Sequence, residues 1–328
     1  MHMKRIIPVV FALLALLPQF SCLGQPETDF RPDKTVFLYA SEAKDLVDPV
    51  IGKELVYAGF EMKESNGITE PEIIRTNGVL LKVGEYARFD LYFPEKPNGQ
   101  MILILPGGGY SGLSTYVGAK SFAQYFVGKG ITAAVVKYRM PNRHPDVPLA
   151  DVQNVMRYCR ANASGWGIRN IGVMGMSAGG HLAASAATMY TDSVTRPDFA
   201  VLLYPVISLD RKYGQNSNTR RNLVGYEEGT DVVAEKYSPD RHVTPQTPPT
   251  FIAMSADDKM AKPLHSLLMY GELVRNGVFA DLHIYPTGGH SWCVLPRTDG
   301  KERFTEYRAE FQLSFSRFLS QMNAQGCK

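Results

Sequence analysis

The most constraining feature of this chain is a series of short, continuously apolar segments separated by stretches with helical spacing. Strands that helices bury on both faces have such uninterrupted apolar sequences. Between the segments, the apolar residues of Leu149–Cys159 recur every three or four positions, as on one face of an amphipathic helix. This alternation predicts an α/β fold with a mostly parallel central sheet flanked by helices, and ligands bound beyond the carboxyl ends of the strands. The predicted buried strands are Met101–Leu105, Ile131–Val136, Ile171–Met174, Phe199–Leu203 and Phe251–Met254, with a last strand at Leu282–Pro286.

Other segments extend this pattern. Apolar and polar residues alternate strictly over Tyr86–Phe93, which predicts a half-buried strand near a sheet edge. Further helices are predicted at Ser266–Asn276, ended by Gly277, and at Phe304–Met322. Residues 26–64 have no clear pattern. No internal repeat or low-complexity linker interrupts the chain, so we expect residues 25–328 to form a single domain.

The N-terminus has the pattern of a sorting signal. The basic pair Lys4-Arg5 precedes the apolar run Ile6–Leu17, which is short for a membrane-spanning helix. We therefore interpret residues 1–24 as a signal peptide cleaved after Gly24, and we expect an exported protein. The alternative is lipidation of Cys22, but the residues before it make a poor lipobox.

Charge and cysteine content exclude several functional classes. Lys and Arg number 35 against 32 Asp and Glu, a formal charge of +3, so no electrostatic argument favours nucleic acid or an anionic membrane surface. Beyond the leader, no segment is apolar enough to cross a membrane. The cysteines contain no CxxC pair, and no histidine pair has metal-ligand spacing, so we expect neither a metal nor an organic cofactor. These cysteines are Cys22, Cys159, Cys293 and Cys327, and the sequence does not determine their pairing.

A candidate nucleophile follows the predicted strand Ile171–Met174. Ser177 lies in the segment Gly175-Met176-Ser177-Ala178-Gly179-Gly180, and helix-forming residues come next. A serine on a tight strand-to-helix turn needs small neighbours, because larger side chains would collide with the turn. Such a turn exposes the hydroxyl above a helix N-terminus, which favours developing negative charge. Close packing of a glycine-rich helix start is the alternative, but the strand-before and helix-after context favours a nucleophile.

A second glycine-rich segment follows the strand that ends at Leu105. Pro106 is followed there by three consecutive glycines, whose backbone N–H groups no side chain shields. We expect Gly108 and Gly109, together with the N–H of Ala178 after the nucleophile, to form an oxyanion hole. A flexible turn is the alternative. A dinucleotide site fits poorly because no acidic residue stands about twenty positions further on.

The remaining candidates come from the last two predicted strands. Asp257 and Asp258 follow the strand that begins at Phe251, and we prefer Asp257 as the orienting carboxylate because it leaves the strand first. An exposed turn aspartate is the alternative for either residue. His290 lies in a glycine-flanked loop after the last strand and is the candidate general base. His181, on the nucleophile helix, is interpreted as a packing residue or a support of the site.

The order Ser177, Asp257, His290, with a glycine-rich strand end upstream, resembles the α/β-hydrolase superfamily. The stretches Leu105–Tyr110 and Gly175–Ala183 are similar to those of small secreted carbohydrate esterases, the acetylxylan-esterase and feruloyl-esterase-like enzymes found with xylan-degrading systems. The similarity extends to Asp281–His290.

This resemblance covers roughly Tyr86 to Leu319 and implies the α/β-hydrolase fold. It has one departure: Pro106 stands where the lipase-type HGGG motif has a histidine that braces the loop. The resemblance therefore implies an oxyanion-hole role for the glycines of this motif, and no role for Pro106.

Together these features predict an exported serine esterase that acts on O-acetyl groups of xylan-like carbohydrate through an acyl-enzyme. A serine peptidase of the prolyl-oligopeptidase type and a non-catalytic hydrolase-like binding protein are the alternatives. Residues 207–249 form a polar insertion that we interpret as a partial lid touching sugar hydroxyls, or else as a solvated excursion. Its candidate contacts are Arg211, Tyr213, Arg220, Arg221 and Tyr226.

Overall fold

A large sheet forms the centre of the computed structural model, which describes residues 30–39, 46, 48, 50–213, 217–227, 230–292 and 306–325. Within these residues the sheet has nine strands in the order β11-β10-β9-β8-β6-β7-β5-β1-β2. The pairs from β7 through β6 to β11 are parallel, and β5 runs antiparallel to both β7 and β1. This is the α/β-hydrolase fold, as the sequence predicted.

The secondary-structure elements lie close to their predicted positions, and Gly277 follows its helix with a positive φ of 69°. The strands are β1 (Lys34–Phe37), β2 (Glu54–Tyr57), β3 (Ile73–Ile74), β4 (Leu80–Leu81), β5 (Arg88–Tyr92), β6 (Gln100–Leu105), β7 (Thr132–Lys137), β8 (Asn170–Met176), β9 (Ala200–Leu203), β10 (Thr250–Ser255) and β11 (Ala280–Tyr285). The α-helices are α1 (Lys120–Val127), α2 (Asp146–Asn162), α3 (Ala178–Thr188), α4 (Ser217–Leu223), α5 (Thr230–Lys236), α6 (Pro263–Arg275) and α7 (Arg308–Gln325). Shorter helical turns are η1 (Thr115–Ala119), η2 (Arg211–Tyr213) and η3 (Pro239–His242).

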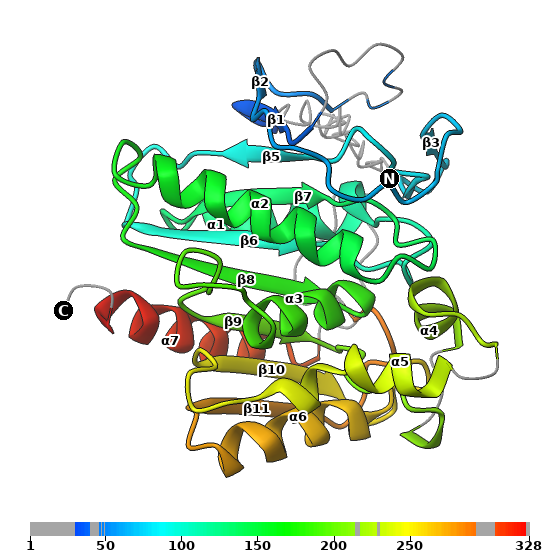
Figure 1. Cartoon of the computed structure of the whole chain (residues 1–328). Coiled ribbons are helices and arrows are strands. Elements are labelled where there is room, and N and C mark those ends of the chain that lie inside the picture. Colours follow the sequence, from blue (N-terminus) through cyan, green and yellow to red (C-terminus); the bar gives the residue numbers. More distant parts are fainter. Residues whose placement is uncertain are drawn as a thin grey trace, which may run out of the picture. The chain divides into compact units, whose positions relative to one another are not determined.

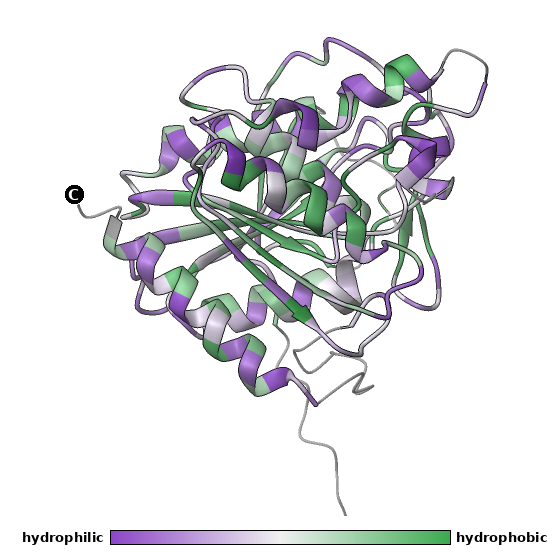
Figure 2. Ribbon diagram, turned by 90° about the horizontal axis from the view of Figure 1, so that it is seen from below, coloured by the Kyte–Doolittle hydropathy of each residue, from purple (hydrophilic) through white to green (hydrophobic). Residues whose placement is uncertain are grey.

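Helices cover both faces of the sheet. Helices α2, α3 and α6 lie on one face, and α1 and α7 lie on the other (Figure 1). Apolar strands lie between helices whose outer faces are hydrophilic (Figure 2). Phe251 of β10 packs against Phe315 and Phe318 of α7, with ring centroids 5.3 and 5.5 Å apart. This two-sided burial explains the uninterrupted apolar sequences of the central strands β6 to β10, which are buried on both faces.

Strand β5 corrects one prediction. We expected a half-buried strand near a sheet edge, but β5 is fully buried and lies between β7 and β1. The polar residues on its second face are buried with charged partners. Arg88 pairs with Asp48 at 2.7 Å and with Glu72 at 2.8 Å. On the same strand, Asp90 pairs with Lys137 of β7 at 2.6 Å, and Lys137 also contacts Asp48 at 2.5 Å.

The segment before β5, which the sequence left without assignment, supplies strands β1 and β2 to the sheet beyond β5. The residues from Arg31 onward form one compact unit. The proposed signal peptide with Cys22, and also Cys293 and Cys327, lie outside the described residues, so export stays a prediction. Cys159 is a buried free thiol. None of the helices described is long and apolar enough to span a bilayer.

The polar insertion at residues 207–249 lies between β9 and β10. It contains η2, α4, α5 and η3, and its helices α4 and α5 lie beyond the carboxyl ends of the parallel strands (Figure 1). Arg220, one of its expected sugar contacts, is instead buried, and its guanidinium donates to the carbonyl of Leu209 at 2.7 Å and to Asp231 at 2.9 Å. Arg220 therefore ties the insertion together.

Candidate active site

Ser177 lies on the sharp turn between β8 and α3. Its backbone has φ 56° and ψ −119°, a conformation that costs a non-glycine residue strain and is typical of a nucleophile elbow. Its N–H donates to the carbonyl of Leu203, and its carbonyl accepts from the N–H of Val206, so β9 and the loop after it hold the turn on both sides. A side chain on Gly179 would come 2.1 Å from the carbonyl oxygen of Leu105, which explains why the turn needs glycine there.

A chain of hydrogen bonds begins at the Ser177 hydroxyl. The Nε2 atom of His290 lies 2.9 Å from Oγ of Ser177, and Nδ1 of His290 lies 2.8 Å from Oδ2 of Asp258. Because an ionised carboxylate only accepts, Nδ1 carries the proton and Nε2 accepts from the serine. The carboxylate of Asp258 is buried, and its other oxygen accepts from the N–H groups of Met260 and Ala261 at 2.8 and 3.0 Å.

The choice of Asp257 as the partner of His290 was wrong in geometry. Asp257 is exposed, and its Oδ1 accepts from the N–H of Gly289 at 2.7 Å. That backbone hydrogen bond lowers the pKa of the Asp257 carboxyl. Asp257 therefore holds the loop that carries His290, and the neighbouring Asp258 contacts the ring. Asp258 caps the N–H groups two and three residues ahead, and these hydrogen bonds hold its carboxylate beside the His290 ring.

The glycine loop after β6 lies against the Ser177 turn. Gly107, Gly108 and Gly109 line one cavity together with Ser177 and His290. Gly108 has φ 145°, and a side chain there would come 2.0 Å from the carbonyl oxygen of Gly112, so the loop closes tightly on itself. Ala178 is the first residue of α3, and its N–H has no acceptor within the helix. Of the three expected oxyanion donors, two thus line the cavity and the third begins the adjoining helix.

Buried tyrosines brace this loop in place of the histidine that Pro106 replaces. The hydroxyl of Tyr138 donates to the carbonyl of Pro106 at 2.7 Å, and the hydroxyl of Tyr110 lies 2.8 Å from Nδ1 of His181. Nε2 of His181 faces the carbonyl of Tyr237 at 2.8 Å, so Nε2 carries the proton and Nδ1 accepts from Tyr110.

Burial determines the protonation states of His181 and of the two tyrosines. It lowers the pKa of His181 to about 4 and raises the pKa of Tyr110 and of Tyr138, so the ring stays neutral and the hydroxyls stay protonated at neutral pH. His181 thus supports the site, as the sequence suggested. The sequence analysis assigned no role to either tyrosine.

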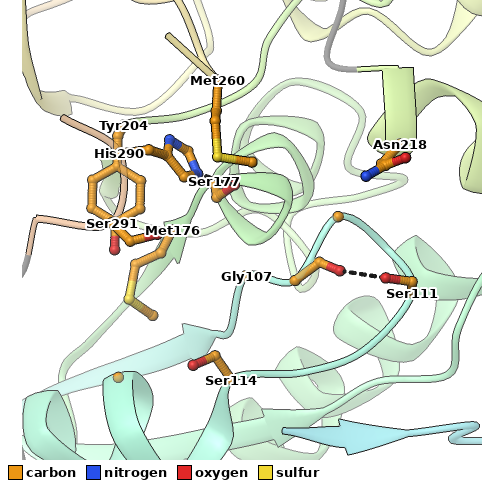
Figure 3. A pocket seen from close by; sticks show the side chains of 13 residues that line it. Gly107, Ser111, Ser114, Met176, Ser177, Tyr204, Asn218, Met260, His290 and Ser291 are labelled. Carbon is orange, nitrogen blue, oxygen red and sulfur yellow. Dashed lines mark hydrogen bonds between the residues drawn. The ribbon is translucent and has the colours of Figure 1, made fainter. Parts of the chain in front are cut away.

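The Ser177 cavity has a volume of about 330 Å³. Figure 3 shows Ser177, His290, Tyr204 and Met260 on one side, Ser111 and Asn218 on the other, and Ser114 below them. Asn218 comes from α4, so the insertion does reach the site, although through a residue that the sequence did not single out. The ring of Tyr204 meets the His290 ring edge to face at a centroid distance of 5.1 Å. Among the described residues, no group of histidine, cysteine and acidic side chains has the arrangement of a metal site.

Comparison with known proteins assigns the family. The family model described as BD-FAE matches residues 89–273, which is more than half of the 328 residues. The chain belongs to the BD-FAE family. The matched segment of this BD-FAE family member includes Ser177, Asp258 and the glycine loop, and it ends before His290.

Two relatives of this BD-FAE family member are larger proteins. An acetylxylan esterase of Xylanibacter ruminicola is 35% identical over 211 residues, which are 63% of this chain and 44% of that protein. Endo-1,4-beta-xylanase B of Butyrivibrio fibrisolvens is 30% identical over 209 residues, which are 59% of this chain and 32% of that protein. The chain thus spans less than half the length of these curated relatives.

Solved structures share the fold. An acetyl ester-xyloside bifunctional hydrolase from Caldicellulosiruptor lactoaceticus has a TM-score of 0.62 and 29% identity, covering 72% of this chain and 89% of that one. A carboxylesterase from Lactobacillus plantarum has a TM-score of 0.61 at 18% identity, covering 79% of this chain and 98% of that one, and it supports the fold alone.

Proposed function

We propose that this protein is a serine esterase that hydrolyses carboxylic esters and that its substrates are O-acetyl groups on xylan-like carbohydrate. The observation that carries the proposal is the hydrogen-bond chain from Ser177 through His290 to Asp258, which opens into a cavity lined by the glycine loop. A hydroxyl, an imidazole and a buried carboxylate in this order are the parts that acyl transfer to a serine requires.

In the proposed reaction, Ser177 Oγ attacks the ester carbonyl carbon while His290 Nε2 takes the hydroxyl proton. Asp258 holds the ring in this tautomer and stabilises its cation. The oxyanion accepts hydrogen bonds from the N–H groups of Gly108, Gly109 and Ala178, and each such donor typically stabilises the transition state by about 3 kcal/mol.

The tetrahedral intermediate then breaks its bond to the alcohol oxygen, which takes the proton from His290. Water, deprotonated in turn by His290, attacks the acyl-enzyme. The carboxylic acid leaves, and the proton returns to Ser177.

The carbohydrate part of the proposal rests on the similarity to an acetylxylan esterase, an endo-1,4-beta-xylanase and an acetyl ester-xyloside bifunctional hydrolase. It also rests on the polar insertion, whose residue Asn218 lines the cavity. Export through the N-terminal leader fits such a substrate, because a polysaccharide stays outside the cell. We include export in the proposal for this reason.

The test uses two readouts. A fluorophosphonate probe should label the parent protein but not Ser177→Ala, and acetate should be released from acetylated xylan by the parent alone. Ser114→Ala is the matched control, since Ser114 also lines the cavity while the hydrogen bond to His290 comes from Ser177, and this variant should keep the label. Equal labelling of Ser177→Ala and the parent would disprove the nucleophile. Turnover confined to aminoacyl or long-chain acyl substrates would disprove the substrate class.

A further inference from the structure

A second pocket adjoins the Ser177 cavity across the glycine loop. It has a volume of about 400 Å³, and Ser111 lines both spaces. Asn222 of α4 connects them further, because its side-chain amide donates to the carbonyl of Gly109 at 2.8 Å. The charged residues and small polar residues of its lining are Lys82, Ser111, Asn142, Arg143, Arg221 and Asn222. We call it the cationic pocket.

The charged side chains that line the cationic pocket are all positive. Lys82, Arg143 and Arg221 line the pocket, and no acidic residue does so among the described residues. Two carboxylates lie nearby, and both are exposed: Glu70 is 3.9 Å from Lys82 and Glu227 is 2.8 Å from Arg143. Exposed pairs of this kind are weak and exchange readily for another anion.

Arg221 links the cationic pocket to the reaction centre. Its guanidinium donates to the side-chain oxygen of Asn218 at 3.1 Å, and Asn218 lines the Ser177 cavity, as Figure 3 shows. Both residues belong to α4, as does Asn222. One helix of the insertion therefore contributes polar side chains to both spaces, which suits a ligand that extends from one into the other.

Backbone strain points to the same two spaces. A positive φ is costly for residues other than glycine, and such strain collects where function requires it. In the described part of the chain, each non-glycine residue with positive φ lines one of the two spaces. Those of the Ser177 cavity are Ser177, Tyr204 and Ser291, and those of the cationic pocket are Lys82, Tyr110, Asn142 and Arg143.

We infer that the cationic pocket is a subsite for the sugar part of the ester and that it takes a sugar carboxylate, the acid group of a uronate residue. Arg221 is the main contact, because a guanidinium binds a carboxylate through two parallel hydrogen bonds, and Arg143 and Lys82 add positive charge. Small polar side chains at Ser111, Asn142 and Asn222 would bind the ring hydroxyls. This inference rests on the proposed esterase function and adds a preference for acidic glycans to it.

The kinetic test compares acetylated xylo-oligosaccharides of equal length with and without a glucuronate branch, and an acetylated oligogalacturonide as a third substrate. We expect the parent to have a kcat/KM three- to tenfold higher for one uronate substrate than for the neutral one, a preference that 0.5 M NaCl weakens. The substrate with the higher value identifies the uronate source. Arg221→Gln should abolish the preference and Arg221→Glu should reverse it. Arg241→Gln, an exposed arginine of the same insertion that lines neither space, should keep it.

A binding measurement separates this inference from the esterase proposal. Calorimetry with the Ser177→Ala protein and unacetylated uronate oligosaccharides needs no turnover, and we expect binding that weakens three- to tenfold when Arg221→Gln is added. If the parent releases no acetate from any substrate while this binding persists, the esterase proposal fails and the subsite stands. Equal kcat/KM for neutral and uronate substrates, or binding that is indifferent to Arg221→Gln, overturns the subsite.

Discussion

Replacing Asp258 by asparagine tests whether its carboxylate sets the tautomer of His290. The side chain is buried, and its Oδ1 accepts from the N–H groups of Met260 and Ala261. An asparagine would keep its oxygen on these donors and would turn its NH₂ group towards His290. Nδ1 would then have to accept, the proton would move to Nε2, and the ring could no longer take the proton of Ser177.

The size of the effect follows from this geometry. The wrong tautomer removes the general base while the fold and the cavity remain, so we expect kcat to fall about 10³- to 10⁴-fold, a loss of about 4–5.5 kcal/mol of transition-state stabilisation. Asp257→Asn makes the same chemical change one residue earlier, at an exposed side chain whose Oδ1 accepts from the N–H of Gly289. It should lower kcat less than tenfold.

Initial rates with p-nitrophenyl acetate measure both variants, and thermal unfolding by circular dichroism verifies that each is folded. The reasoning is refuted if Asp258→Asn keeps a tenth or more of the parental kcat, or if Asp257→Asn loses as much as Asp258→Asn.

Three further perturbations probe the support of the site. Tyr138→Phe leaves the buried carbonyl of Pro106 without its donor, so we expect a loss of about 1–3 kcal/mol in unfolding free energy by urea denaturation and a several-fold lower kcat, whereas an unchanged kcat would contradict the bracing role. Burial lowers the pKa of His181 and of His265 from 6.5 to about 4, so unfolding takes up protons in this range. The free energy of unfolding should therefore be highest above pH 6.5 and fall towards pH 4 by up to roughly 3 kcal/mol per histidine. Urea denaturation at a series of pH values measures this, and in His265→Gln the free energy of unfolding should fall with pH about half as steeply as in the parent. Gly108→Ala places a methyl group 2.0 Å from the carbonyl oxygen of Gly112, so the loop must shift and kcat for p-nitrophenyl acetate should fall at least tenfold, and a parental rate would show that the loop donors are dispensable.

The sequence was most informative where a short-range pattern dictates the structure. The apolar strands, the turn at Ser177 and the loop of His290 were all located, because in a parallel sheet the functional residues must follow strand ends. The choice between Asp257 and Asp258 failed because it depends on which way a turn directs two adjacent side chains. That direction is set by backbone contacts to Met260 and Gly289, which no pattern of residue types records.

Polar contacts between residues far apart in the chain could not be predicted from the sequence. The alternation over Tyr86–Phe93 indicated a solvent-facing side, but Arg88 and Asp90 are buried against charges from elsewhere in the chain. Sequence alone does not distinguish a charged residue that meets water from one that meets a distant partner. The same holds for residues 31–57, whose two short strands are specified by the sheet they join.

The buried ions around β5 also define where a functional protein fragment must begin. The family match starts at residue 89, yet Lys137, deep in the sheet, contacts Asp48 as well as Asp90. Expressing only the matched residues would remove Asp48 and strands β1 and β2, and would leave a buried ammonium group with one of its two carboxylates. Losing a partner inside a protein typically costs about 3–5 kcal/mol, a large part of the stability of an ordinary domain. Recombinant versions that begin at residue 89 should therefore be recovered in aggregates, and those that start before Arg31 in solution.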